Sequence, residues 1–470
     1  MKKKHQKSPG GILRTVLLAL VLASAAGTAA AQAPGRGSAG PTVRATTPLI
    51  QAGDTVEVGG TGFKAGQKVT LSAAGDTLNA LPFVADAEGR FSGRITVPGD
   101  ASLGAWPVAI QAEGAADSSF DLKISRRLPL SGQERFSIAG NKLVQGLYQS
   151  AYSARSNAVY VTSAIGRPPV KQSELLKVDP ATLQIVARAV PAPAPAREPQ
   201  PGQKPRESGL YAVYGVAVDD ARGTVWVTNS RQNTVAVYNQ SDLSLVKQFP
   251  ADAVPHARDV VIDAGQGKAF VSATSGSFVS VFDTRTLEQL EHIQIPSGKA
   301  GQDFRPASLE LDADNGRLYA VGLGAAEVAV IDTASDKVEK VFPLDNARSA
   351  IGVGWDAENK RVLVVSQGSD NLLVVDPRTG KTVHDVYVGA GALNVDWDPA
   401  SKLAYVSNRV AGTVAVVDTA SGKLVANLDG GSNPNHVYAD GKGNVFAINK
   451  SRGTDDPKGD RITRIAAKVQ

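Results

Sequence analysis

Short runs of alternating apolar and polar residues fill the chain from about residue 134 onward. "TVWVTN" at 224–229, "TVAVYN" at 234–239 and "TVAVVD" at 413–418 are rich in β-branched and aromatic residues. Clusters of Gly, Asn, Asp and Pro separate these runs. Alternation with a period of two, bounded by turn residues, predicts short half-buried β-strands joined by tight turns.

The same pattern returns at regular intervals. An acidic turn residue is followed about seven positions later by a large apolar residue, except that Ser153 takes the acidic position in the first copy. The anchors are Tyr160, Trp226, Phe270, Tyr319, Leu363, Tyr405 and Phe446, separated by 66, 44, 49, 44, 42 and 41 positions. Four strands per repeat of this length are typical of a propeller blade. We therefore expect an all-β protein with a seven-bladed β-propeller of four-stranded blades over 126–470.

The ends of this region predict how the ring closes. The last repeat runs out at "RITRIAAKVQ", which supplies a third strand without a fourth. Upstream of the first repeat, "ERFSIAG" (134–140) is a strand pattern that belongs to no other blade. We expect this upstream strand to complete the last blade.

A separate unit precedes the propeller, over 41–125. "DTVEVGGTGFKAGQKVTLSA", "GRFSGRITVP" and "GAWPVAIQAEG" alternate in the same way and are broken by Gly- and Pro-containing turns. This length and pattern predict a small β-sandwich of the immunoglobulin-like (Ig-like) class. The Cys…Trp…Cys core of antibody domains is absent, so only the class is predicted.

The N-terminus has the pattern of an export signal. A basic start, the apolar run "VLLALVLASAAG" and an Ala-x-Ala site at Ala31 predict a signal peptide over 1–31. The whole chain has 50 Lys and Arg against 45 Asp and Glu; the leader holds five of the basic residues and no acidic one, so 45 of each remain. Bulk charge therefore favours neither nucleic acid nor anionic membranes as partners. We expect a periplasmic, secreted or cell-surface protein, soluble after cleavage.

The chain contains no cysteine, which excludes disulfides, thiolate nucleophiles and sulfur-ligated metals. One insertion, "PAPAPAREPQPGQKP" at 191–205, accounts for the long first interval. Its composition favours extended polyproline conformation. Two interpretations remain open for it, a solvated insertion and a contact arm.

Motifs for catalysis are missing. The aspartates at two repeated positions fit turn caps better than catalysis. His256, His292, His384 and His436 occur singly, with no His-x-x-x-His pair, nucleophile elbow or phosphate-binding loop. We assign no catalytic residue, no metal ligand and no cofactor.

Candidate binding residues come from the loops that enter the first strand of each blade. In a propeller these loops and those joining the second and third strands lie at one mouth of the channel. They place donors and aromatic side chains there: Tyr214, His256, Arg258, Arg305, Arg348, Asn394, Asn435 and His436, with Arg231, Arg409, Lys450 and Arg452 from the other loops. Such a mildly basic mouth suits an anionic or polar ligand, and Tyr with Arg can stack a base. The alternative is that these residues only satisfy loop backbones and neighbouring carboxylates.

The repeats resemble those of YVTN-type propeller proteins. The second strand reads "WVTN" at 226–229 and "YVSN" at 405–408, and "GLYQSAYSARSNAVYV", "LLKVDPATLQIV" and "RVAGTVAVVD" resemble the periplasmic YncE-type members. The resemblance covers about 134–470 and implies an exported seven-bladed propeller, loosely linked to single-stranded DNA binding. "GTGFKAGQKVTL" and "DAEGRFSGRITVP" resemble Ig-like modules of bacterial surface and secreted proteins.

Two functional hypotheses follow. The first is a non-enzymatic binding or scaffold protein that presents the mouth to a protein, peptide or polymer of the envelope, single-stranded DNA included. The second is a hydrolase or lactonase-like propeller enzyme that uses His256 or His436 as a base beside Asp259. The second predicts a histidine–carboxylate pair within hydrogen-bond reach in the channel.

Overall fold

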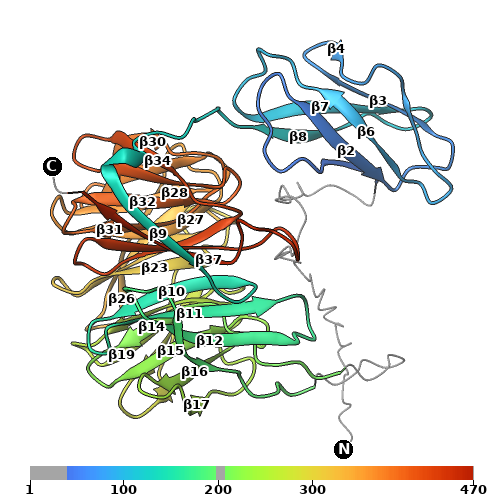
Figure 1. Ribbon diagram of the computed structural model, residues 1–470. Coiled ribbons are helices and arrows are strands. Elements are labelled where there is room, and N and C mark those ends of the chain that lie inside the picture. Colours follow the sequence, from blue (N-terminus) through green and yellow to red (C-terminus); the bar gives the residue numbers. More distant parts are fainter. Residues whose placement is uncertain (1–39, 197–206, 469–470) are drawn as a thin grey trace, which may run out of the picture.

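The computed structural model describes residues 40–196 and 207–468 (Figure 1). Within these ranges the protein consists of β-strands and one short 3₁₀ helix, η1 (Gln133–Arg135). The predicted signal peptide lies outside the described residues, as does part of the Pro-rich insertion. Pro193, in the described start of that insertion, forms an antiparallel bridge with Leu210, which follows the insertion.

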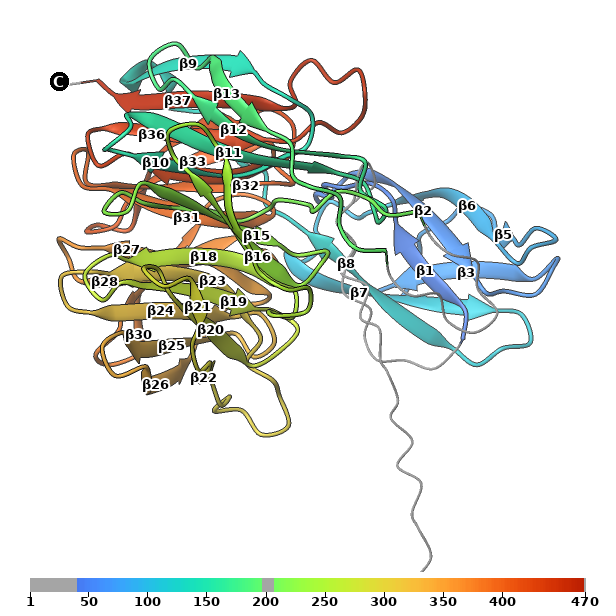
Figure 2. The same ribbon diagram turned by 90° about the horizontal axis from the view of Figure 1, so that it is seen from below.

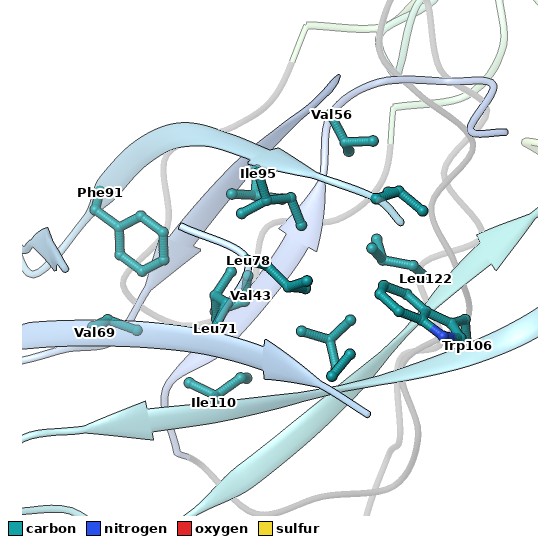
Figure 3. Packing of buried hydrophobic residues seen from close by; sticks show 14 of the residues in the cluster. Val43, Val56, Val69, Leu71, Leu78, Phe91, Ile95, Trp106, Ile110 and Leu122 are labelled. Atoms are coloured by element: carbon teal, nitrogen blue, oxygen red, sulfur yellow. The ribbon is translucent and has the colours of Figure 1, made fainter. Parts of the chain in front are cut away.

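Two sheets form the N-terminal unit. One has the order β1-β2-β6 and the other β4-β3-β7-β8, with β5 paired to β3. Their strands are β1 (Thr42–Ala45), β2 (Thr55–Thr61), β3 (Lys68–Ala73), β4 (Asp76–Thr77), β5 (Phe83–Val84), β6 (Phe91–Thr96), β7 (Gly104–Ala112) and β8 (Ser118–Ile124). Alternate residues of both sheets point into one shared core, in which Leu71, Ile95 and Trp106 are buried (Figure 3). The unit is thus a two-sheet sandwich, and its Ig-like assignment stays a prediction.

Seven further sheets lie between Phe136 and Ala467 in the described chain, each antiparallel and built around four strands, which follow sequence order in all but the last sheet. The first three contain β10 (Leu147–Ser153), β11 (Ala158–Ile165), β12 (Gln172–Val178) and β13 (Ile185–Ala189); β14 (Val216–Asp219), β15 (Thr224–Asn229), β16 (Thr234–Asn239) and β17 (Leu245–Gln248); and β18 (Ala257–Asp263), β19 (Lys268–Ala273), β20 (Phe278–Asp283), β21 (Glu288–Gln289) and β22 (Ile293–Gln294).

The next three contain β23 (Pro306–Asp312), β24 (Arg317–Gly322), β25 (Glu327–Asp332) and β26 (Lys337–Pro343); β27 (Ala350–Asp356), β28 (Arg361–Ser366), β29 (Asn371–Asp376) and β30 (Lys381–Tyr387); and β31 (Ala392–Asp398), β32 (Leu403–Asn408), β33 (Thr413–Asp418) and β34 (Lys423–Asp429). The last combines β35 (Pro434–Ala439), β36 (Asn444–Asn449) and β37 (Arg461–Ala467) with β9 (Phe136–Lys142).

The first strands of these sheets contact one another in a closed cycle. β10 contacts β14, each following first strand contacts the next, and β35 contacts β10 again. The second and third strands are almost wholly buried because both of their faces pack against neighbouring sheets; Trp226, Phe270 and Tyr405 are completely inaccessible. This arrangement is a β-propeller, as the repeats predict.

Closure of the ring joins distant parts of the sequence. β9 pairs antiparallel with β37 from Phe136↔Ala467 to Lys142↔Arg461. The predicted completion of the last blade by the strand at 134–140 is therefore confirmed. Hydrogen bonds take the place that a disulfide holds in other closed folds.

The repeated aspartates are turn caps, as predicted. Asp356 accepts hydrogen bonds from the backbone N–H groups of Glu358 and Asn359 at 3.0 and 2.9 Å. At the other repeated position, Asp283 accepts from Arg285 and Thr286 at 2.7 and 2.9 Å. These carboxylates satisfy donors in turns that would otherwise be left unpaired.

The N-terminal unit lies at one side of the ring (Figure 2). Its end contacts loop and strand residues of the sheet β27–β30. Ser125, just after β8, donates to Asp370 in the β28–β29 loop at 2.7 Å, and Lys123 forms an ion pair with the same carboxylate. The Tyr387 hydroxyl donates to the Arg126 carbonyl at 2.7 Å, and the Arg126 guanidinium lies 5.0 Å from the Tyr387 ring centroid. Asp370 is 3% exposed, so this junction is a packed one.

Candidate functional site

The predicted loops meet at one end of the ring. In each sheet the start of the first strand, the end of the second and the start of the third share one edge, because neighbouring strands run antiparallel. Tyr214 precedes β14, Arg231 follows β15, Arg409 follows β32 and Lys450 follows β36. All four belong to this edge, which we call the mouth face.

Two tyrosines form the centre of a cluster on this face. Tyr148 of β10 and Tyr214 pack edge to face, with ring centroids 4.8 Å apart. Arg231 donates from Nε to the Tyr214 hydroxyl at 3.2 Å, and its guanidinium lies 6.0 Å from the Tyr214 ring centroid. Tyr214 is 5% exposed, which leaves Tyr148 as the more accessible ring.

Three further side chains complete this group. The Lys450 amine lies 5.3 Å from the Tyr148 ring centroid. Asn435 of β35 donates to the Tyr148 carbonyl at 2.5 Å and accepts a hydrogen bond from the Arg409 guanidinium. Burial and the charge of Arg409 lower the pKa of Lys450 to about 7, Asp460 opposes them, and Arg231 lowers the pKa a little further. The mouth cluster therefore consists of Tyr148, Tyr214, Arg231, Arg409, Asn435 and Lys450.

A second group of cations continues the cluster along the mouth. Burial and the charges of Arg231, Arg258 and Arg305 lower the pKa of His256 to about 4. Arg258 donates to the Ser308 hydroxyl at 2.6 Å, and Arg305 donates to the Thr274 carbonyl at 3.4 Å. The His256 ring is therefore neutral at neutral pH, and positive charge at this side comes from the arginines.

Two of the predicted residues hold inner strands together. Asn394 of β31 accepts from the Val437 N–H of β35 at 2.7 Å. His436 lies with Nδ1 3.4 Å from both the N–H and the hydroxyl of Ser150 in β10, and burial together with Arg258 lowers its pKa to about 3. Both side chains connect one sheet to the next, which gives them a structural role.

Arg348 is apart from the cluster. It is exposed in the loop before β27, where its backbone N–H is bonded to the Ser369 hydroxyl at 3.1 Å. This is the sheet that contacts the N-terminal unit. The other predicted cations come from the second, third, fourth, sixth and seventh sheets of the ring.

Carboxylates line the inner strands below the mouth. Asp259 accepts from the Leu309 N–H at 3.1 Å, and Asp396 accepts from the Ala439 N–H at 2.7 Å, so each bridges two sheets. Burial raises the pKa of Asp396 to about 7. Burial and the charges of Asp396 and Asp259 hold the pKa of Glu310 well above its usual range. Basic side chains at the mouth are thus followed, further along the first strands, by carboxyl groups whose protonated forms are favoured.

Pairs that would signal catalysis or metal binding are missing from the described residues. Neither His256 nor His436 forms an ion pair or hydrogen bond with a carboxylate there. In residues 40–196 and 207–468, no three His, Asp or Glu side chains gather where they could hold a metal ion.

The same ranges contain no helix with the length and apolarity that crossing a bilayer requires.

Tyr148, Glu310 and Asp396 are not among the residues that the sequence predicts for the site. The predicted residues come from the entering segments of the second and later repeats, which leaves out "GLYQS" (146–150) of the first. Aligning this segment with "PHARD" and "NPNH" is the signal that could have found Tyr148, because it puts Tyr148 at the repeat position of Arg258 and Asn435. Glu310 and Asp396 lie further along the first strands, where alternation alone does not separate channel-facing from core-facing positions.

Comparisons with known proteins agree with this fold. No protein-family model matches the chain. YncE of Salmonella typhi is 25% identical over 248 residues, which are 50% of this chain and 63% of that protein; YncE of Escherichia coli K12 is 25% identical over 254 residues, 52% and 65%. The chain thus spans less than two thirds of the length of these relatives.

Solved structures extend the comparison. A streptogramin B lyase superposes with a TM-score of 0.54 at 12% identity, covering 72% of this chain and all of that one. The Kuenenia stuttgartiensis hydrazine synthase gives 0.54 at 16% identity, covering 70% of this chain and 98% of that one. At these identities the likeness concerns the fold alone. The sequence and structural comparisons together support a YncE-like β-propeller.

Proposed function

We propose that this protein is an exported, non-enzymatic binding protein whose mouth cluster takes an anionic group of a protein, peptide or polymer partner. The observation that carries the proposal is the convergence of Arg409, Lys450 and Arg231 on the Tyr148–Tyr214 pair. None of Arg409, Lys450, Arg258 and Arg305 forms an ion pair with a carboxylate of the described chain. An incoming anion would offset the cost of holding these cations together.

Aromatic rings beside cations favour one kind of anion. Tyr148 offers a ring face to a planar group, while Arg409 and Lys450 offer donors to the charge that accompanies it. Single-stranded nucleic acid combines bases that stack with phosphates that ion-pair, which makes it the first polymer to test. Protein or peptide carboxylates are the next.

The hydrolase or lactonase-like alternative has less support. It requires a base whose proton affinity is set by a nearby carboxylate, and neither channel histidine has such a partner in the described residues. The low pKa values of both histidines also make them weak bases at neutral pH.

Export and the role of the sandwich belong to the same proposal. The signal pattern over 1–31 favours the periplasm, the cell surface or secretion. The packed junction at Asp370 would hold the Ig-like unit beside the loop of Arg348 at the mouth face, where it can dock to the same partner.

The test is binding of a labelled single-stranded oligonucleotide to the protein at low and moderate salt. Arg409→Gln combined with Lys450→Gln is expected to weaken binding and to reduce the slope of log affinity against log salt by about 0.7 for each phosphate that the protein no longer neutralises. The matched control is Arg378→Gln with Lys402→Gln, which removes the same charge from exposed turns at the opposite edge.

Equal loss of affinity in both double variants would show that only net charge matters and would reject the mouth as the site. Absence of binding at low salt would reject nucleic acid. Pull-downs with envelope proteins would then test the protein or peptide partner.

A further inference from the structure

Lys450 is the one amine of the mouth cluster, and its surroundings differ from those of an ordinary surface lysine. It lies at the end of β36, half-buried, with Nζ 5.3 Å from the Tyr148 ring centroid. In the described residues this amine donates no hydrogen bond and forms no ion pair. Its backbone is fixed, because Lys450 N–H donates to the Asn433 carbonyl at 3.1 Å.

Three charged groups and one aromatic ring surround Lys450, each from a different neighbouring segment. Arg409 follows β32, Arg231 follows β15, Tyr148 belongs to β10, and Asp460 precedes β37. Asp460 is 3% exposed and is already bonded to the Gly146 and Ser451 N–H groups at 2.8 and 3.1 Å. Positive neighbours therefore outweigh the single acidic one.

A lysine that is desolvated and next to other cations is a good nucleophile. With a pKa of about 7, close to half of the Lys450 amines are neutral at pH 7, whereas an ordinary lysine is neutral in roughly one molecule of 2,500. Arg409 would bind the acid group of a small molecule and so hold that molecule next to the Lys450 amine.

We propose that Lys450 captures the carbonyl group of an anionic aldehyde or keto acid as a reversible imine. The inference rests on the proposed function, because the anion site is what brings the carbonyl to the amine. The Lys450 nitrogen forms a bond to the carbonyl carbon as the C=O π bond breaks. The resulting carbinolamine then loses its oxygen as water, which carries away the two amine hydrogens, and a C=N bond remains. No oxidant or reductant is needed.

The experiment compares two probes that share a ring and a phosphate. Pyridoxal 5′-phosphate carries an aldehyde, and pyridoxine 5′-phosphate carries an alcohol in its place. The protein is incubated with the aldehyde, sodium borohydride reduces any imine to a stable amine, and mass spectrometry measures labelling at each lysine. Lys442 is the internal control, since its amine also lies 5.3 Å from a tyrosine ring centroid, that of Tyr152, but the residue is exposed.

We expect Lys450 to be labelled about tenfold faster than Lys442 at pH 7, with a rate that rises as pH increases through about 7. Lys450→Met removes this labelling. Arg409→Gln keeps the amine and moves the midpoint of the pH profile upward, because one of the charges that lowers the pKa is gone.

Labelling of Lys450 no faster than that of Lys442 overturns the imine, whatever the binding result. Pyridoxine 5′-phosphate reports separately on the anion site, by slowing the labelling of Lys450 in competition. If it fails to compete while Lys450 is still labelled preferentially, the amine is reactive as proposed and the anion site of the proposed function is wrong.

Discussion

The Ser125 hydroxyl at the end of the sandwich donates a 2.7 Å hydrogen bond to the Asp370 carboxylate of the propeller. The other Asp370 oxygen accepts from the Gly391 N–H at 2.7 Å and pairs with Lys123. One buried carboxylate thus ties the last strand of the sandwich to two loops of the mouth face.

Asp370→Ala should therefore loosen the junction. It leaves the Gly391 N–H without its acceptor and the partly buried Lys123 amine with only the Gln367 carbonyl, which we expect to cost about 1–3 kcal/mol of unfolding free energy. Thermal unfolding measures this loss, and limited trypsin digestion measures exposure of Arg126 and Arg127. Asp345→Ala, an exposed aspartate of the neighbouring loop, is the control. Unchanged digestion would show that Asp370 does not hold the two units together.

Phe136→Ala should destabilise the closed ring. Phe136 of β9 is 4% exposed and packs edge to face on Tyr405 with centroids 6.4 Å apart. Removing a buried aromatic ring costs about 3–5 kcal/mol, measured as a lower denaturant midpoint. Ile138→Ala changes the same strand at a site that is 44% exposed and should cost less than about 1 kcal/mol. Similar losses for both variants would contradict a closure that depends on the buried face of β9.

Glu310→Gln should stabilise the protein in a pH-dependent way. Because the folded pKa of Glu310 is raised, the unfolded chain releases this proton first, and native stability falls as pH rises above the unfolded value of about 4.3. The neutral glutamine escapes that loss, so the variant should be more stable than the parent at pH 8 and should show no such gain at pH 4. Denaturant unfolding at the two pH values tests this. Glu291→Gln, at an exposed site, should show no such difference.

Asp283→Asn should act with the opposite sign. Hydrogen bonds from the Thr286 N–H and from Arg285 lower the pKa of Asp283 to about 2. A lowered pKa stabilises the fold above the unfolded value of about 3.9, and this contribution disappears as pH falls toward 2. The variant should lose less than about 1 kcal/mol at pH 7, because the Arg285 partner is 68% exposed and water screens the pair, and should match the parent near pH 2. A deficit that persists at pH 2 would assign the effect to lost hydrogen bonding alone.

Nearly all of the propeller fold can be predicted from the repeats, because the corresponding strands of every repeat share the same alternation and the same turn residues. Anchors such as Trp226 and Phe270 occupy the same buried position in every sheet, so alternation and turn residues suffice to place them. Ring closure was predictable for the same reason, since the β9 pattern had no other sheet to join. The sandwich–propeller junction was not, because Lys123 and Asp370 follow no repeat.

The candidate site was predictable only in its location. Loop positions place Tyr214, Arg231 and Lys450 at one edge of the sheets, and the structure brings them together. Some of these side chains form hydrogen bonds with the backbone of a neighbouring sheet. Whether they do depends on distances between sheets, which cannot be read from the sequence of one repeat. Asn394 and His436 therefore resemble ligand-binding residues in the sequence, although both connect inner strands.

The pairing of β9 with β37 also constrains how the chain folds. Arg461 donates a hydrogen bond to the Gly140 carbonyl across 321 positions of sequence. Contacts of such large sequence separation form late, because the loop-closure entropy opposes them until the rest of the ring has formed. The last sheet stays open until residues 461–467 are available, and unpaired strand edges are prone to aggregation. During synthesis, the interval before these residues arrive is therefore when the unpaired edge of β9 is open to pairing with other chains.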